Sequence, residues 1–138
     1  MSVLSREGGL VNTTTGFSID TRALGKTAFD TLLIAGSTDI PEVSAELIAR
    51  LRTSAPRARR VGSVCTGAFI FAATGLLEGR QATTHWAMAR ELQQRFPEIQ
   101  VTEDRIYTAD GALWTSAGMT SCIDMALAML TDDLGAQA

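Results

Sequence analysis

The hydrophobic pattern of the chain contains two short apolar runs, Thr31–Gly36 and Arg60–Cys65, and the first ends in glycine. Continuous apolar runs of this length are typical of strands that are buried on both faces of a parallel sheet. The pattern predicts a further strand over Ala112–Ala117 and a short one over Gln81–Thr84.

Segments with helical periodicity separate these strands. One helix is predicted to begin around Asp39–Glu42, because Asp39 suits the N-cap and Pro41 suits the first turn. We expect this helix to end before Pro56. The other predicted helices are Thr66–Thr74, Trp86–Phe96 and the strongly apolar Met119–Leu130. We expect most of the hydrophobic face of the last helix to be buried within the domain.

The remaining segments are shorter and more polar. We expect Val3–Ser5 to be extended. Turn residues at Gly8-Gly9 and Asn12–Gly16 indicate a weak hairpin. We also expect Ile99–Thr108 to be extended, and Asp110-Gly111 indicates a hairpin turn after it.

Strands that alternate with helices predict a single α/β domain over residues 1–138, with a mostly parallel sheet covered on both faces. In such sheets, ligands bind beyond the carboxyl ends of the strands. Gly36, Cys65 and Gly118 all fall at such ends. We therefore expect a small-molecule site there.

Composition narrows the possible functions. The net charge is −3, so we expect no nucleic-acid binding by this chain alone. No apolar run reaches membrane-spanning length and no leader-like segment opens the chain, which favours a cytoplasmic location without membrane contact. With two cysteines and one histidine, we expect neither a disulfide framework nor a metal site, and no cofactor.

Val64-Cys65-Thr66-Gly67 is the strongest candidate for chemistry. A cysteine that ends a strand and precedes a small residue and glycine suits a tight turn into a helix. The free N–H groups at that helix end favour the thiolate, and the Thr66 amide is a candidate oxyanion donor. The Gly36-Ser37 loop is a candidate source of a second donor. A buried structural cysteine would show the same local pattern.

His85 is the only imidazole, and it follows a short strand, so it is a candidate base, orienting group or ligand contact in the same crevice. A hydrogen-bonded structural histidine is the simpler interpretation. Cys122 lies in the apolar helix, and we expect it to be a core residue.

Several blocks of sequence together are distinctive: Gly62–Ala68, Gly75–Arg80, Ala82–Trp86, Trp114–Thr120 and Ile123–Leu127. They resemble the ThiJ/PfpI superfamily, also called class I glutamine amidotransferase-like, from about Val3 to Leu134. The resemblance implies a flavodoxin-like three-layer fold with Cys65 at a nucleophile elbow. The Thr-Thr-His-Trp form at His85 is similar to two branches, the N-terminal domains of AraC-type transcription regulators and the isonitrile hydratase-like enzymes.

Two departures from the superfamily pattern affect the expected activity. Family members begin with a strand and helix that carry an acidic residue facing the elbow cysteine, and this chain resembles the family from its second strand onward. An AraC-type regulator would also continue beyond Leu134 into a DNA-binding domain, which we do not find in this sequence. We therefore expect the first strand–helix unit and the acid to be missing.

The resemblance leaves three functions open. The favoured one is a ligand-sensing regulatory domain of AraC type, for which we expect no catalysis. The alternative is a cysteine-dependent lyase or hydrolase of isonitrile hydratase type, with Cys65, Thr66 and His85 as catalytic residues and Gly36, Ser37 and Gly118 also at the ligand. The third is an inactive structural remnant. A glutamine amidotransferase is disfavoured because the expected His-x-Glu is absent.

Assembly follows from the expected missing strand. Without that strand, one edge of the Thr31–Gly36 strand has no partner, and an unpaired apolar edge favours joining a second chain. We therefore expect a homodimer or a higher oligomer.

Overall fold

The computed structural model describes residues 1–13 and 15–135, so Thr14 in the predicted hairpin turn lies outside the described residues. The strands are β1 (Leu4–Ser5), β2 (Gly9–Asn12), β3 (Ser18–Ala23), β4 (Thr31–Ile34), β5 (Arg60–Val64), β6 (Gln81–Ala82), β7 (Gln100–Val101), β8 (Tyr107–Asp110) and β9 (Leu113–Ser116). The α-helices are α1 (Ala45–Ser54), α2 (Gly67–Ala73), α3 (Ala89–Arg95) and α4 (Ser121–Leu134), and short 3-10 helices cover Ala55–Arg57 and Trp86–Met88.

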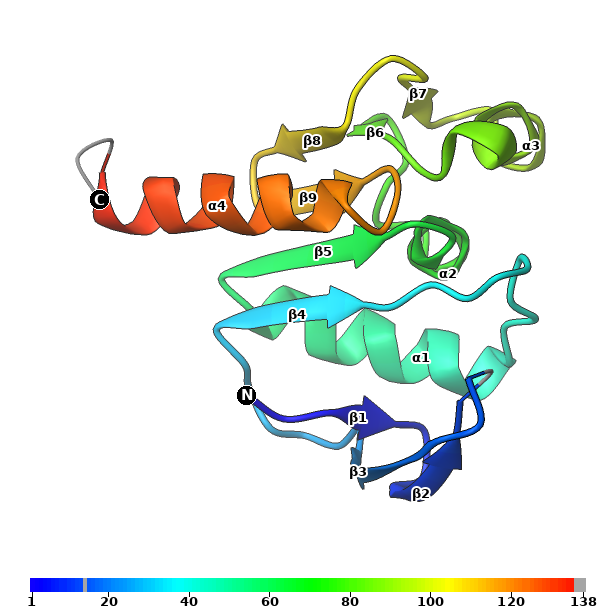
Figure 1. Ribbon diagram of the computed structural model, residues 1–138, viewed down its shortest axis with the longest axis vertical. Coiled ribbons are helices and arrows are strands. Elements are labelled where there is room, and N and C mark those ends of the chain that lie inside the picture. The colour runs from blue at the N-terminus through cyan, green and yellow to red at the C-terminus, as the bar shows by residue number, and fades with distance from the viewer. Residues whose placement is uncertain (14, 136–138) are drawn as a thin grey trace.

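The central sheet has the strand order β4-β5-β9-β8. β4, β5 and β9 run parallel, and β8 is antiparallel to β9. α4 lies across one face of this sheet, while α1 and α2 lie on the other (Figure 1). The predicted three-layer α/β architecture with a mostly parallel sheet is therefore confirmed.

β4 is an edge strand of the sheet. The predicted N-terminal hairpin forms a separate sheet, β1-β3-β2, and in the part of the chain that the structure describes it is not hydrogen-bonded to β4. Leu32 and Ile34 are buried, but Leu33 is 50% exposed, so the expectation of burial on both faces of this strand is wrong. The reason is that α4 packs over β8 and β9 and leaves the same face of β4 uncovered.

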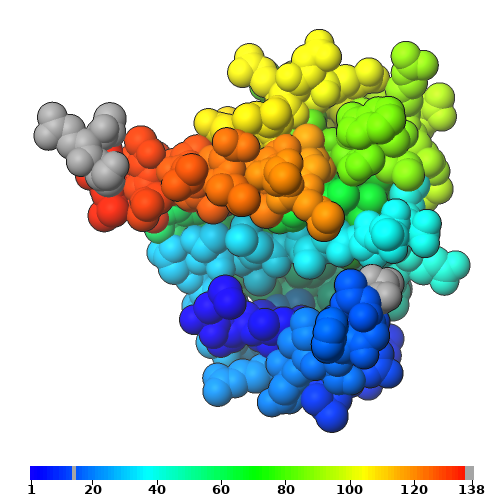
Figure 2. Space-filling view, viewed as in Figure 1, coloured from blue at the N-terminus to red at the C-terminus, as the bar shows by residue number. Residues whose placement is uncertain are grey.

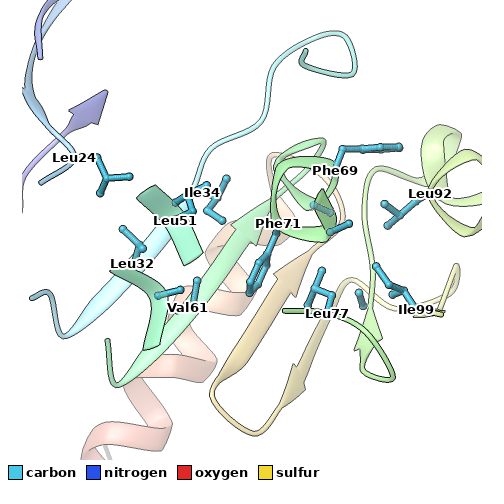
Figure 3. Packing of buried hydrophobic residues seen from close by; sticks show 14 residues of the cluster. Leu24, Leu32, Ile34, Leu51, Val61, Phe69, Phe71, Leu77, Leu92 and Ile99 are labelled. Carbon is cyan, nitrogen blue, oxygen red and sulfur yellow. The ribbon is translucent and has the colours of Figure 1, made fainter. Parts of the chain in front are cut away.

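Most of the core lies between the sheet and the helices α1 and α2. Phe71 and Leu77 are fully buried there, and Leu32, Ile34 and Val61 of the sheet pack in the same cluster (Figure 3). A smaller cluster under α4 consists of Trp114, Met125 and Met129.

Two helices differ from the sequence expectation. α1 begins at Ala45, not near Asp39, because Ser44 caps it by accepting a hydrogen bond from the Leu47 N–H at 3.2 Å. α4 was expected to bury most of its hydrophobic face, and this is wrong. Met125 and Met129 are its buried residues, whereas Ile123, Leu127, Leu130 and Leu134 are exposed.

Candidate functional site

Cys65 connects the end of β5 to the start of α2 in a conformation unusual for its residue type. Its φ is +54°, and among the described residues it is the only non-glycine with a positive φ. The Cys65 N–H donates to the Ser116 carbonyl at 3.0 Å, and the Cys65 carbonyl accepts from the Thr84 hydroxyl at 2.8 Å. These bonds hold a left-handed backbone that costs about 1–2 kcal/mol in a residue with a Cβ. The tight turn expected from the sequence is therefore present.

The next residue, Thr66, joins this turn to the loop after β4. Its buried hydroxyl accepts from the Ser37 N–H and donates to the Ser37 carbonyl, both at 2.8 Å. The Ser37 amide, part of the loop expected to supply a second oxyanion donor, is thus already bonded to Thr66. Thr66 therefore positions the loop through its side chain, and its own main-chain N–H remains the candidate donor.

Glycine is required where the two turns touch. A Cβ on Gly36 would lie 2.7 Å from the Val64 oxygen and 2.8 Å from the Thr66 nitrogen. A Cβ on Gly67 would lie 2.4 Å from the Ile34 oxygen. No side chain fits at either distance, so these glycines allow the loop and the cysteine turn to pack backbone against backbone.

His85 lies directly after Thr84, whose hydroxyl bonds to the cysteine turn. Its Nδ1 accepts from the Ala87 N–H at 3.3 Å, so the ring caps the short helix Trp86–Met88. This is a hydrogen bond of the kind that the structural interpretation of the histidine expects. An acceptor at Nδ1 leaves Nε2 as the nitrogen that carries the proton in the neutral ring.

A hollow of about 540 Å³ is lined by residues that directly follow the two hydrogen-bond partners of Cys65, since His85 follows Thr84 and Ala117 follows Ser116. His85 and Gly118 line it, as do Trp86, Glu103, Asp104, Arg105, Ile106, Ala117, Met119, Thr120 and Ser121. Cys65, Thr66, Gly36 and Ser37 are not among the lining residues. The predicted site residues thus form two adjacent groups, one around the cysteine turn and one in the hollow.

Sequence reasoning missed most of the residues around the hollow. Arg105 and Ile106 lie in the loop before β8, and Thr120 and Ser121 precede or begin α4. Their positions depend on how the loops converge, which local pattern does not show. Trp86 carried a usable signal, since it follows the candidate histidine directly, and its side chain is largely exposed.

Cys122 also lies at a helix N-terminus, in the first turn of α4. The expectation that it is a core residue is wrong, because it is partly exposed and its thiol donates to the Met119 carbonyl at 2.7 Å. Position at a helix end therefore does not distinguish the two cysteines.

The main charged cluster lies at the opposite end of the sheet, where β4 and β5 begin. Arg59 donates to Asp30 at 2.8 Å and also pairs with Asp133 of α4. The hydrogen bond from Arg59 and a second from Thr31 lower the pKa of Asp30 to about 2. Hydrogen bonds from Arg59 and Arg60 likewise lower the pKa of Asp133. This cluster ties α4 to the sheet and is far from the cysteine turn along the strands.

Within residues 1–13 and 15–135, no three His, Cys, Asp or Glu side chains are grouped as metal ligands would be. None of the helices in the same ranges is long and apolar enough to cross a membrane.

Comparison with known proteins gives a family match over most of the chain. The model of the DJ-1/PfpI family matches residues 1–132. The HTH-type transcriptional regulator CdhR of Pseudomonas aeruginosa is 34% identical over 98% of this chain, which spans 41% of CdhR. The isonitrile hydratase of Pseudomonas putida is 44% identical over 62% of this chain and 36% of the hydratase.

A solved structure shows the same fold. It is an AraC family transcriptional regulator from Pseudomonas putida, which superposes with a TM-score of 0.86 over 99% of this chain and 75% of its own, at 21% identity. The resemblance seen in the sequence is confirmed, and the chain belongs to the DJ-1/PfpI family.

Proposed function

We propose that this chain is a ligand-sensing regulatory domain of an AraC-type transcription regulator, acting in the cytoplasm as a homodimer and without catalysis. One observation carries the proposal. The regulator CdhR aligns with 98% of the chain, whereas isonitrile hydratase aligns with 62%. The similarity to a regulator thus includes the N-terminal hairpin and α4 as well as the cysteine turn.

The geometry around the hollow supports binding of a small molecule. Its volume of about 540 Å³ falls in the range of ligand pockets. Trp86, Ile106 and Met119 offer apolar surface, while Arg105 and Ser121 offer hydrogen-bond donors. In this proposal His85 and Gly118 contact the ligand, and the turn formed by Gly36, Ser37, Cys65 and Thr66 closes the site beside it.

A ligand screen tests the proposal. Small metabolites would be screened by thermal shift on the whole chain, and hits would be measured by calorimetry. We expect Trp86→Ala to weaken binding about tenfold or more, the equivalent of about 1.4 kcal/mol. Phe17→Ala is the matched control, since Phe17 is 75% exposed and Trp86 77% exposed, and Phe17 lies on the N-terminal hairpin side. Equal effects of the two exchanges would argue against a site in the hollow.

The alternative function is a cysteine-dependent enzyme, favoured by the left-handed Cys65. Strained backbone at a reactive residue is a recurring feature of active sites. In this alternative the thiolate of Cys65, at the nucleophile elbow, adds to the isonitrile carbon, one C–N π bond opens, and Nε2 of His85 gives that carbon a proton. Water then adds to the same carbon and displaces the Cys65 thiol, which releases the formamide, while the Thr66 amide holds the oxygen during this step.

Isonitrile hydration distinguishes the two functions. Water added to an isonitrile gives an N-substituted formamide, which proton NMR detects directly. We expect no formamide above the buffer rate from the wild-type chain. Formation that is lost in Cys65→Ser would establish the enzyme instead.

A further inference from the structure

In the part of the chain that the structure describes, three hydrogen bonds to its main chain hold the strained turn at Cys65. The Cys65 N–H donates to the Ser116 carbonyl at 3.0 Å, and the Cys65 carbonyl accepts from the Ala68 N–H at 3.3 Å and from the Thr84 hydroxyl at 2.8 Å. Only the last of these three bonds is made by a side chain. An exchange at Thr84 can therefore remove it while both bonds between main-chain groups stay in place.

The bond from Thr84 is comparable in strength with the strain that it opposes. A left-handed conformation costs a non-glycine residue about as much free energy as one neutral hydrogen bond contributes. Thr84 is buried, so its hydroxyl is shielded from competing bulk water. The conformation of Cys65, with a φ of +54°, therefore depends on this one bond more than that of an ordinary helical or extended residue would.

Thr84 also belongs to a segment that borders the hollow. His85, which follows it, lines the hollow, and Thr83, which precedes it, donates its hydroxyl to the carbonyl of Arg105, another lining residue, at 3.1 Å. Figure 2 shows the segments that line the hollow, coloured yellow-green, yellow and orange, next to one another on one face of the molecule. A contact in the hollow with His85 or Arg105 therefore acts on the residues on either side of the bond from Thr84 to Cys65.

The direction of the Cys65 thiol depends on the same turn. Cys65 is partly exposed, whereas Thr66, Gly67 and Ala68, which follow it, are buried. The left-handed turn thus keeps the thiol accessible in a short segment that is otherwise closed. A relaxed turn would change the direction of the thiol and reduce its exposure.

We propose that Thr84 is a positioning residue that links the hollow to the Cys65 thiol. Its hydroxyl keeps Cys65 in the left-handed turn, and a molecule that contacts His85 displaces Thr84 and lowers the reactivity of the thiol. This link deepens the sensing function and rests on it, since it takes the hollow as the ligand site. It gives the cysteine turn a role in a domain without catalysis, as an element that responds to binding.

Alkylation of Cys65 by iodoacetamide, followed by mass spectrometry, tests the role of the hydroxyl. Thr84→Val removes the hydroxyl at nearly constant size and is expected to slow Cys65 about fivefold, the factor that one hydrogen bond supplies. Thr84→Ser keeps the hydroxyl and is expected to restore most of the rate. The rate of Cys122, read in the same sample, should not change.

Thr131→Val is the matched control for the loss of a hydroxyl. It also removes a threonine hydroxyl that donates to a main-chain carbonyl, that of Leu127 at 3.0 Å on α4. We expect it to leave the Cys65 rate unchanged. Equal Cys65 rates in Thr84→Val and Thr131→Val, or a Thr84→Ser chain as slow as Thr84→Val, would overturn the proposal.

A double-mutant cycle tests the link to the hollow without any ligand. His85→Ala removes the ring that lines the hollow and accepts from the Ala87 N–H at 3.3 Å. It is expected to slow Cys65 in the wild-type chain and to have no further effect in Thr84→Val. An unchanged Cys65 rate in His85→Ala, or the same factor of slowing in both backgrounds, would contradict the link.

The His85→Ala arm leaves Thr84 in place, so it stays decisive even where Thr84→Val does not fold. Because no ligand enters the cycle, its failure would leave the sensing function standing. A hollow that binds nothing in the ligand screen would, in turn, leave the link from His85 through Thr84 to Cys65 standing.

Discussion

The two cysteines of this protein differ in their hydrogen bonds more than in their exposure. Both are partly exposed and both lie near a helix N-terminus. Cys122 donates its thiol proton to the Met119 carbonyl, while Cys65 uses its main-chain N–H and carbonyl to hold a left-handed turn. These hydrogen bonds make Cys65 the better candidate for a reactive cysteine.

We expect Cys65 to react with iodoacetamide faster than Cys122. The hydrogen bond from the Cys122 thiol to the Met119 carbonyl must break before that sulfur can attack the reagent. A labelling time course read by mass spectrometry measures both rates in one sample. Urea-unfolded protein is the control, in which the two rates should converge. A faster Cys122 in the folded chain would remove the preference for Cys65.

At the scale of elements, the site depends on main-chain contact between the loop after β4 and the start of α2. Gly67→Ala should destabilise the chain by about 1–3 kcal/mol or more, because its Cβ would lie 2.4 Å from the Ile34 oxygen. Gly25→Ala is the control, since its Cβ would lie 3.8 Å from the nearest atom, the Ala23 oxygen. Urea denaturation measures both changes. Similar losses for the two variants would mean that the close approach does not stabilise the fold.

The charged cluster at the other end of the sheet gives a pH dependence. The hydrogen bond from Arg59 lowers the pKa of Asp30 from 3.8 to about 2. The stability that ionised Asp30 contributes to the fold is therefore complete above about pH 4 and is lost as the pH falls toward 2. Arg59→Gln should therefore reduce stability at neutral pH and flatten the loss between about pH 4 and 2. Denaturation curves at several pH values measure this. Arg90→Gln, at an exposed arginine 3.9 Å from Glu103, should leave the profile unchanged.

At the scale of the whole molecule, a regulatory role does not require DNA binding by this chain. With a net charge of −3, it has little capacity to neutralise DNA phosphates. We expect the isolated chain to give no sequence-specific gel shift at submicromolar concentration. A specific shift that persists in competitor DNA would refute this expectation.

The sequence by itself determined the order of strands and helices, the tight turn at Cys65 and the family. These depend on local information: apolar runs, turn residues and short blocks such as Val64–Gly67. A strand that ends in Cys-Thr-Gly favours a tight turn into a helix. The structure contains this turn, with Cys65 in a left-handed conformation.

Only the tertiary structure decided which apolar surfaces are covered. Leu33 of β4 and the exposed isoleucine and leucines of α4 have the same hydrophobic character as their buried neighbours, so periodicity could not tell the exposed side from the inner one. The hollow depended on loops from distant parts of the chain that meet beside His85. Burial and loop convergence are long-range properties, set by where each element packs and not by its own residues.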